Sequence, residues 1–187
     1  YGKTTAIREF FSSSETQVLW QTVYDDAPTS FWQEFCRLFK GIDGNSAQNL
    51  QELGFPHDSV LLQEAVQMVA DAAFPDQTFL VIDDYHLLAS PQIDGFVERL
   101  AMHGIPGLHI VLITRYSGRL NIEELALKGY LHLIAKETLE LTPPEITEYY
   151  KACGVNLHHD EIERLHALTE GWISALYLFM LELISHG

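Results

Sequence analysis

The first five residues, Tyr1-Gly2-Lys3-Thr4-Thr5, have the residue types and spacing of the second half of a phosphate-binding loop. In the full pattern G-x-x-x-x-G-K-[ST], called Walker A, backbone N–H groups and the start of a helix surround the phosphates. Lys3 would reach the β and γ phosphates, and the Thr4 hydroxyl would bind Mg²⁺. Three matched residues also occur at ordinary helix starts, so a second signal is required.

The second signal is a pair of carboxylates after an apolar run, Phe79-Leu80-Val81-Ile82-Asp83-Asp84. The run suits a strand that is buried on both faces of a parallel sheet, and ligands bind at the carboxyl ends of such strands. We expect Asp83 to hold Mg²⁺ and Asp84 to orient or deprotonate a water that attacks the γ phosphate. In isolation the pair would be interpreted as a helix cap. Because it follows Gly-Lys-Thr by 80 residues, we prefer the nucleotide role, known as Walker B.

A second buried run, Ile110-Val111-Leu112-Ile113, ends in Thr114-Arg115. An arginine at the end of a neighbouring strand can approach the γ phosphate and report its presence. The alternative is an ordinary surface arginine after a strand. We favour a sensor role for Arg115 because all three features fall at strand ends.

Composition limits the function further. The chain has 187 residues, 47% of them hydrophobic, and a formal net charge of −15. That charge argues against a grip on a nucleic-acid backbone by this segment. Cys36 and Cys153 lack metal-type spacing, so we expect reduced thiols in a cytoplasmic protein. The sequence has no apolar run long enough to span a membrane. We expect no metal other than Mg²⁺, and we interpret His158-His159 as the polar start of a helix.

Elements that would position these residues alternate along the chain. Hydrophobic periodicity predicts strands over 18–24, 79–84, 110–115 and 131–141, and helices over 3–13, 30–39, 59–73, 92–103 and 122–128. Residues 41–54 resemble a loop. Alternating strands and helices indicate an α/β fold with a parallel, doubly wound sheet. From Pro143 onward only helices are predicted, so we divide the chain into a nucleotide-binding domain, 1–142, and a small all-α subdomain, 143–187.

Taken together, these segments resemble the ATPase domain of the large ATP-dependent LuxR-type transcription regulators, which belong to the STAND class of P-loop NTPases. The match covers nearly the whole chain. Its parts are Tyr-Gly-Lys-Thr-Thr at 1–5, Trp20 with Asp25-Asp26 and Phe31, Val-Ile-Asp-Asp-Tyr-His at 81–86, Ile-Thr-Arg at 113–115, Leu-Thr-Pro-Pro-Glu-Ile at 141–146 and Thr-Glu-Gly-Trp-Ile-Ser-Ala-Leu at 169–176. The Asp-Asp-Tyr-His and Thr-Glu-Gly-Trp segments are the more specific ones.

The resemblance implies an AAA-like three-layer sandwich that holds ATP or ADP with Mg²⁺ and hydrolyses ATP slowly. Residues 1–5 would bind the nucleotide, Thr4 and Asp83 the metal, and Asp84 and Arg115 would serve hydrolysis. Such a module acts as a switch whose active form self-associates, and DNA is bound by a separate C-terminal domain. The first Walker A glycine and its strand would precede Tyr1, so we expect a longer parent chain. Ile173 stands where relatives carry a proline that touches adenine, and we assign it no such contact.

Three other interpretations stay open. The same switch serves signalling or defence scaffolds that bind no DNA. A fast kinase would need a substrate pocket, and a motor would need nucleic-acid contacts, which the acidity disfavours. A P-loop fold that binds nothing is the fourth interpretation.

Overall fold

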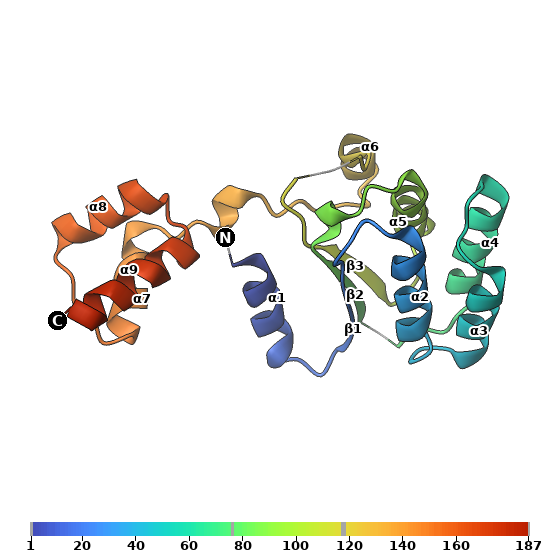
Figure 1. Cartoon of the computed structure of the whole chain (residues 1–187), viewed down its shortest axis with the longest axis horizontal. Helices are drawn as coiled ribbons and strands as arrows, with labels where there is room; N and C mark the ends of the chain where they lie inside the picture. The colour runs from blue at the N-terminus through green and yellow to red at the C-terminus, as the bar shows by residue number, and fades with distance from the viewer. Residues whose placement is uncertain (1, 76, 117–118, 187) are drawn as a thin grey trace. The chain divides into compact units, whose positions relative to one another are not determined.

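The computed structural model describes residues 2–75, 77–116 and 119–186. It divides into two compact units. The sheet unit comprises Phe10–His132, and the helical unit comprises Tyr1–Glu9 together with Leu133–Gly187. Helix α1 (Lys3–Ser12) begins in the helical unit and ends in the sheet unit. Figure 1 labels the elements of both units.

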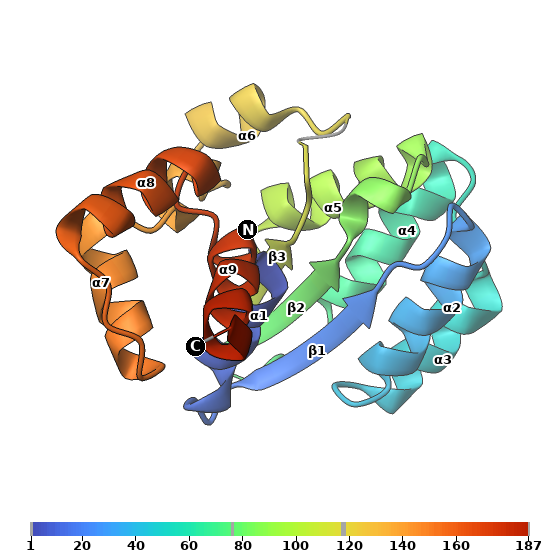
Figure 2. The same cartoon turned by 60° about the vertical axis from the view of Figure 1, so that its left-hand side comes forward.

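Within the described residues, the sheet has three parallel strands: β1 (Gln17–Thr22), β2 (Thr78–Asp83) and β3 (Leu108–Leu112). Their order is β1-β2-β3, with Leu80 of the central strand opposite Leu19 on one side and Ile110 on the other. All three strands end at the same edge of the sheet (Figure 2). Strand β2 is the most buried, as its unbroken apolar sequence predicts.

Helices α2 (Pro28–Phe39) and α5 (Pro91–His103) lie next to one face of this sheet, and α3 (Gly44–Leu53) and α4 (Ser59–Ala70) lie farther out on the same side (Figure 1). Aromatic side chains fill the space between α2 and α5. The ring of Phe96 lies 5.2 Å from those of Trp32 and Phe35, measured between centroids. Edge-to-face packing of this kind adds to the gain from burial. The core therefore fixes α2 and α5, the helices that follow β1 and β2.

Side chains of the opposite face alternate with those of the core, since successive residues of a strand point to opposite faces. Phe79 points to this face, where its ring meets Phe11 at 4.8 Å and His109 at 4.9 Å. After β3 the chain forms α6 (Ile122–Leu127), and a 3-10 helix η1 (Tyr85–Leu87) directly follows β2.

The helical unit contains a 3-10 turn η2 (Lys136–Leu139) and the helices α7 (Pro143–Ala152), α8 (His159–Thr169) and α9 (Ile173–His186). Thr142 and Glu145 form a reciprocal capping box at the start of α7. The buried Tyr150 hydroxyl donates to the Leu176 carbonyl at 2.7 Å and so ties α7 to α9. The prediction that only helices follow Pro143 is confirmed for the described residues.

Gly171 joins the segment before α9 to the segment before α7 through a backbone hydrogen bond with Leu141. Its φ is +69°, and its carbonyl accepts a 2.9 Å bond from the N–H of Leu141. A Cβ atom at this position would lie 2.4 Å from the Leu141 carbonyl oxygen. The glycine of the Thr-Glu-Gly-Trp segment is therefore explained by backbone contact with the Leu-Thr-Pro-Pro segment.

Two sequence predictions were wrong. Residues 41–54 are not a loop, because Asp43 caps α3 by accepting from Asn45 and Ser46 N–H groups, and Leu50 is buried beneath it. Residues 131–141 form no strand, because they find no neighbouring strand to bond with, and Leu133 is 64% exposed. The boundary proposed at 142/143 stays a prediction.

The fold is α/β with a parallel sheet and is compatible with a P-loop NTPase. No helix among the described residues has both the length and the apolar character needed to cross a bilayer.

Candidate nucleotide-binding site

Backbone hydrogen bonds continue past the strands and align the segments that carry the predicted residues. Beyond β1, the N–H of Val23 donates to the Asp83 carbonyl at 2.9 Å. Beyond β3, the N–H of Ile113 donates to Ile82 at 2.9 Å, and the Ile113 carbonyl accepts from Tyr85 at 3.1 Å. The segments that follow all three strands are thus held side by side at the carboxyl edge of the sheet.

Asp83 and Asp84 stand at this edge in different surroundings. Asp83 is 3% exposed, and its Oδ1 accepts the N–H of Asp84 at 3.0 Å. Asp84 has φ +55° and ψ +34°, a left-handed conformation that costs a non-glycine residue about 1–3 kcal/mol. Its side chain is 45% exposed. The backbone turn therefore directs one carboxylate into the structure and leaves the other accessible.

Thr114 and Arg115 follow β3 next to this turn. The Thr114 hydroxyl donates to the Tyr116 carbonyl at 2.6 Å, which fixes the backbone on both sides of Arg115. Arg115 itself is exposed. The sheet unit therefore brings the Asp83-Asp84 turn and the segment of Arg115 to one edge.

The residues predicted to form the Walker A loop belong to the helical unit. Tyr1 lies outside the described residues, while Gly2, with φ +70°, leads into the first turn of α1, which holds Lys3, Thr4 and Thr5. The Gly2 carbonyl accepts the N–H of Ala6 at 2.8 Å. Gly-Lys-Thr thus opens a helix, as a phosphate-binding loop requires.

Ile173, the first residue of α9, lies against Gly2. A Cβ atom on Gly2 would be 2.8 Å from the Cγ2 atom of Ile173. The start of α9 therefore lies beside the segment predicted to bind phosphate, within the same unit. Ile173 is the position at which relatives carry a proline, and its neighbour in this structure is Gly2.

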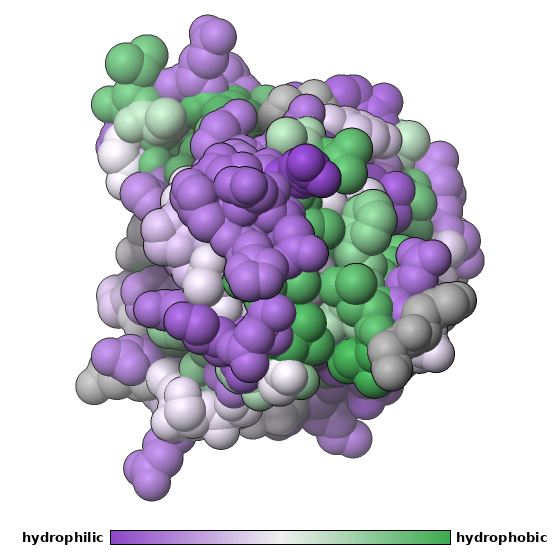
Figure 3. All heavy atoms as spheres, turned by 90° about the vertical axis from the view of Figure 1, so that its left-hand side faces the viewer, coloured by the Kyte–Doolittle hydropathy of each residue, from purple (hydrophilic) through white to green (hydrophobic). Residues whose placement is uncertain are grey.

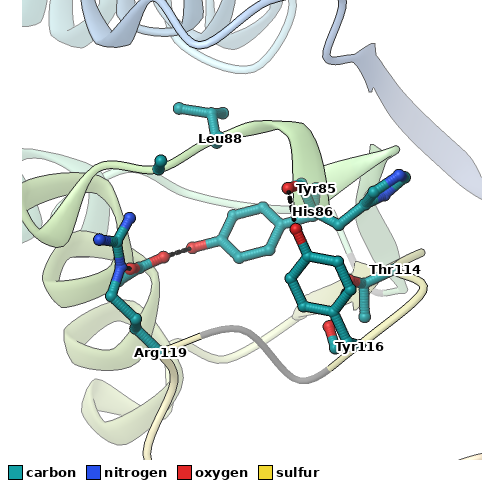
Figure 4. A pocket seen from close by; sticks show the side chains of 8 residues that line it. Tyr85, His86, Leu88, Thr114, Tyr116 and Arg119 are labelled. Atoms are coloured by element: carbon teal, nitrogen blue, oxygen red, sulfur yellow. Dashed lines mark hydrogen bonds and ion pairs between the residues drawn. The ribbon is translucent and has the colours of Figure 1, made fainter.

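A cavity of about 320 Å³ opens beside the carboxyl edge (Figure 4). On its wall, the Tyr85 hydroxyl donates to Asp94 Oδ1 at 2.6 Å, and Arg119 Nε lies 3.4 Å from Asp94 Oδ2. Burial and the bond to Asp94 raise the pKa of Tyr85 well above its usual value. The sequence did not reveal this group of three, because Asp94 and Arg119 lie 9 and 34 residues after Tyr85.

Asp26 has a supporting role at the same edge. Its Oδ1 accepts the N–H of Ala89 at 2.6 Å, which ties the segment after β1 to the segment after β2. The sequence placed Asp26 in the family resemblance without a role. Its structural contribution is to hold the loop that precedes α5.

Among the residues that the structure describes, no cluster of three or more histidine, cysteine, aspartate or glutamate side chains is arranged to hold a metal ion. An Mg²⁺ ion that is bound with a nucleotide takes few ligands from the protein and several from phosphate and water. Asp83, a carboxylate at a strand end, has the oxygen chemistry that this ion prefers.

Comparison with known proteins gives one consistent result. The chain is 26% identical over 188 residues to an HTH-type transcriptional regulator MalT of Cronobacter sakazakii. It is 25% identical over 190 residues to one of Vibrio campbellii, and 26% identical over 190 residues to one of Klebsiella pneumoniae. Each match covers 97% of this chain. The resemblance to transcription regulators of the LuxR type is confirmed.

The chain spans about a fifth of the length of these regulators, since each match covers 21% of the relative. No protein-family model matches it. The similarity therefore concerns one region of a large regulator.

Proposed function

We propose that this chain is the ATP-binding switch module of a LuxR-type transcription regulator. The observation that carries the proposal is the alignment of the Asp83-Asp84 turn and the Arg115 segment at one sheet edge, in a chain that resembles such regulators along nearly its whole length. Ligands of parallel α/β sheets bind at this edge. The proposed architecture is the AAA-like three-layer sandwich, with helices on both faces of the sheet.

Each proposed residue has a distinct task. Lys3 and the N–H groups at the start of α1 bind the phosphates, while Thr4 and Asp83 hold Mg²⁺ through oxygen atoms. When bound, Mg²⁺ neutralises the negative charge that develops on the phosphates. Asp84, which is accessible, orients or deprotonates the attacking water, and Arg115 reads the γ phosphate.

Slow hydrolysis suits a regulator, because the lifetime of the ATP-bound state then sets the lifetime of the signal. In the whole regulator, we propose that the ATP form self-associates and that DNA is contacted by a different domain. The charge of −15 on this chain agrees with that division. A full-length protein without any DNA-binding region would instead favour a signalling scaffold that uses the same switch.

The test is nucleotide affinity of the natural full-length protein, measured by calorimetry. Lys3→Ala removes the phosphate-binding charge and is expected to weaken both ATP and ADP binding about tenfold or more, equivalent to about 1.4 kcal/mol. Lys40→Ala is the control, since Lys40 follows α2 at the opposite edge of the sheet. Unchanged affinity in Lys3→Ala for both nucleotides would refute the phosphate-binding role.

Asp84→Asn separates hydrolysis from binding. A residue that acts on the attacking water stabilises the transition state more than the ground state. We therefore expect the variant to retain ATP affinity while its turnover falls, which traps the ATP form. Equal losses in affinity and turnover would place Asp84 in metal binding or in folding instead.

A further inference from the structure

His86 has a buried ring nitrogen that has no role in the proposed nucleotide site. It lies in η1, two residues after Asp84, and its side chain is 9% exposed. The Nδ1 atom is buried and has no hydrogen-bond partner among the described residues. Leaving a buried polar atom without a hydrogen bond is unfavourable. We infer that this nitrogen has a hydrogen-bond partner in another state of the site.

Asp84 is placed to be that partner. Its Oδ1 lies 3.8 Å from His86 Nδ1, about 0.9 Å longer than an ordinary N–H···O hydrogen bond. Asp84 is partly exposed and carries a strained backbone, so its carboxylate has room to move while its Cα is held. A small rotation of the carboxylate would close the gap.

Tyr116 links this pair to the segment of Arg115. Its hydroxyl donates to the His86 carbonyl at 2.9 Å, and the two rings meet nearly edge-on, with centroids 5.8 Å apart. Figure 4 shows Tyr116 reaching up to His86 from the chain that also carries Thr114. The Thr114 hydroxyl holds Tyr116 from the other side. The backbone on either side of Arg115 is therefore attached to the residue that faces Asp84.

We propose that His86 is a positioning residue whose Nδ1–H donates to Asp84 and holds that carboxylate toward the attacking water. Because the Tyr116 hydroxyl bonds to the His86 carbonyl, the position of His86 depends on the segment that carries Arg115. The inference rests on the proposed role of Asp84 in hydrolysis. It adds a mechanical link, because a shift of the Arg115 segment on γ-phosphate binding would reach Asp84 through Tyr116 and His86. Phosphate sensing and water positioning would thus be one event.

Two conservative substitutions test which ring nitrogen matters. His86→Asn keeps an N–H donor near the place of Nδ1, whereas His86→Gln moves the donor toward the place of Nε2. In the natural full-length protein, we expect His86→Gln to slow ATP turnover about 10- to 100-fold, the usual effect of losing a supporting partner. His86→Asn should stay close to the parent rate, and ATP affinity should be unchanged in both. Equal turnover in the two variants overturns the proposal.

Tyr116→Phe tests the link. It removes the hydroxyl that holds the His86 carbonyl but keeps the ring, so we expect slower turnover with unchanged affinity. Turnover equal to that of the parent would show that His86 acts without Tyr116 and would overturn the coupling.

A spectroscopic arm needs no activity. In ¹⁵N-histidine-labelled protein with Mg-ATP bound, Nδ1 of His86 is expected to carry the proton, and Asp84→Asn should shift its resonance. If the His86 Nδ1 resonance is the same in the parent and in Asp84→Asn, the proposed contact is overturned. If Lys3→Ala leaves nucleotide affinity intact, the proposed function fails on its own, and this contact can still be examined without nucleotide. The two ideas are therefore separable.

Discussion

Gly171 leaves no space for a side chain. Its φ of +69° already disfavours other residues, and a Cβ atom would meet the Leu141 carbonyl oxygen at 2.4 Å. We expect Gly171→Ala to lower the free energy of unfolding of the helical unit by about 3 kcal/mol or more, from backbone strain and overpacking together. Chemical denaturation measures this.

Gly154 is the matched control for that change. It also has a positive φ, +81°, but nothing lies within 4 Å of a Cβ atom built there. Gly154→Ala should therefore cost only the conformational penalty, about 1 kcal/mol. Equal losses in the two variants would show that the contact with Leu141 has no energetic weight.

Tyr85 is expected to stabilise the wall of the cavity through its bond to Asp94. Tyr85→Phe removes a buried hydrogen bond to a carboxylate, a change that costs about 1.5–3 kcal/mol of stability. Tyr24→Phe is the control, since Tyr24 is 86% exposed and should change stability little. Denaturant unfolding near pH 7 compares the two.

The same residue gives a pH dependence. Burial raises the pKa of Tyr85 in the folded protein, so the folded state holds this proton more tightly than the unfolded state does. Its contribution is fully present below about pH 10, the unfolded pKa, and is lost as pH rises above that value. The fall in stability above pH 10 should be shallower in Tyr85→Phe. An unchanged slope would mean that Tyr85 is accessible to hydroxide without unfolding.

Helices α2 and α5 depend on their aromatic contacts. Phe35 is 2% exposed and packs on Phe96 of α5 at 5.2 Å and on Trp32 at 5.6 Å. Phe35→Ala should destabilise the sheet unit by about 3–5 kcal/mol and change the emission of Trp32. Leu127→Ala on α6, where the side chain is 89% exposed, should stay within about 0.5 kcal/mol of the parent. Similar losses in both would contradict a core between α2 and α5.

Elements with a strong hydrophobic period could be predicted from the sequence. Strand β2 and helix α5 appear close to their expected bounds because burial on two faces or on one face leaves a clear pattern. Helix α3 could not be predicted in this way, since only Ala47 and Leu50 are buried and its first residues resemble a turn. The expected strand over 131–141 had a suitable sequence but lacked a neighbour, which sequence period cannot reveal.

The residues of the candidate site also fall into those that could be predicted from the sequence and those that could not. Asp83, Asp84 and Arg115 could be proposed because each lies within two residues of the end of an apolar run. His86 and Tyr116 could not, because their hydrogen bond joins residues 30 positions apart. Contacts of this kind depend on how strands pair, so they become visible only when the sheet register is known.

Across the whole molecule, the two cysteines report on different units. Cys36 lies buried in the sheet unit and Cys153 is exposed in the helical unit. Burial raises the pKa of Cys36 to about 11 from its ordinary value of 9.0, which leaves about a hundredfold less thiolate near neutral pH. A disulfide reagent at pH 8 should modify Cys153 at once and Cys36 only when the sheet unit opens.

Urea makes this a measure of cooperativity. If the units unfold together, Cys36 becomes reactive across the transition that also removes helical signal from α7–α9. If they unfold separately, Cys36 modification and the loss of that signal occur at different urea concentrations. Rapid labelling of Cys36 without urea would contradict its burial in the core.

The surface also differs from an evenly polar one. Helix α9 exposes Leu178, Leu181 and Ile184, among others, and Figure 3 shows hydrophobic side chains gathered beside polar ones on the face where the C-terminal helices lie.

The discontinuous helical unit has a consequence for synthesis on the ribosome. Residues 10–132 form one compact unit and emerge before residues 133–187, so this unit can fold early, while the segment at 2–9 belongs to a unit that residues 133–187 complete. At about 5–20 residues per second, the 55 residues 133–187 take about 3–11 seconds to appear. The contact between Gly2 and Ile173 is therefore among the last to form. The order of synthesis therefore differs from the order of completion: the helical unit begins first along the chain but is completed after the sheet unit.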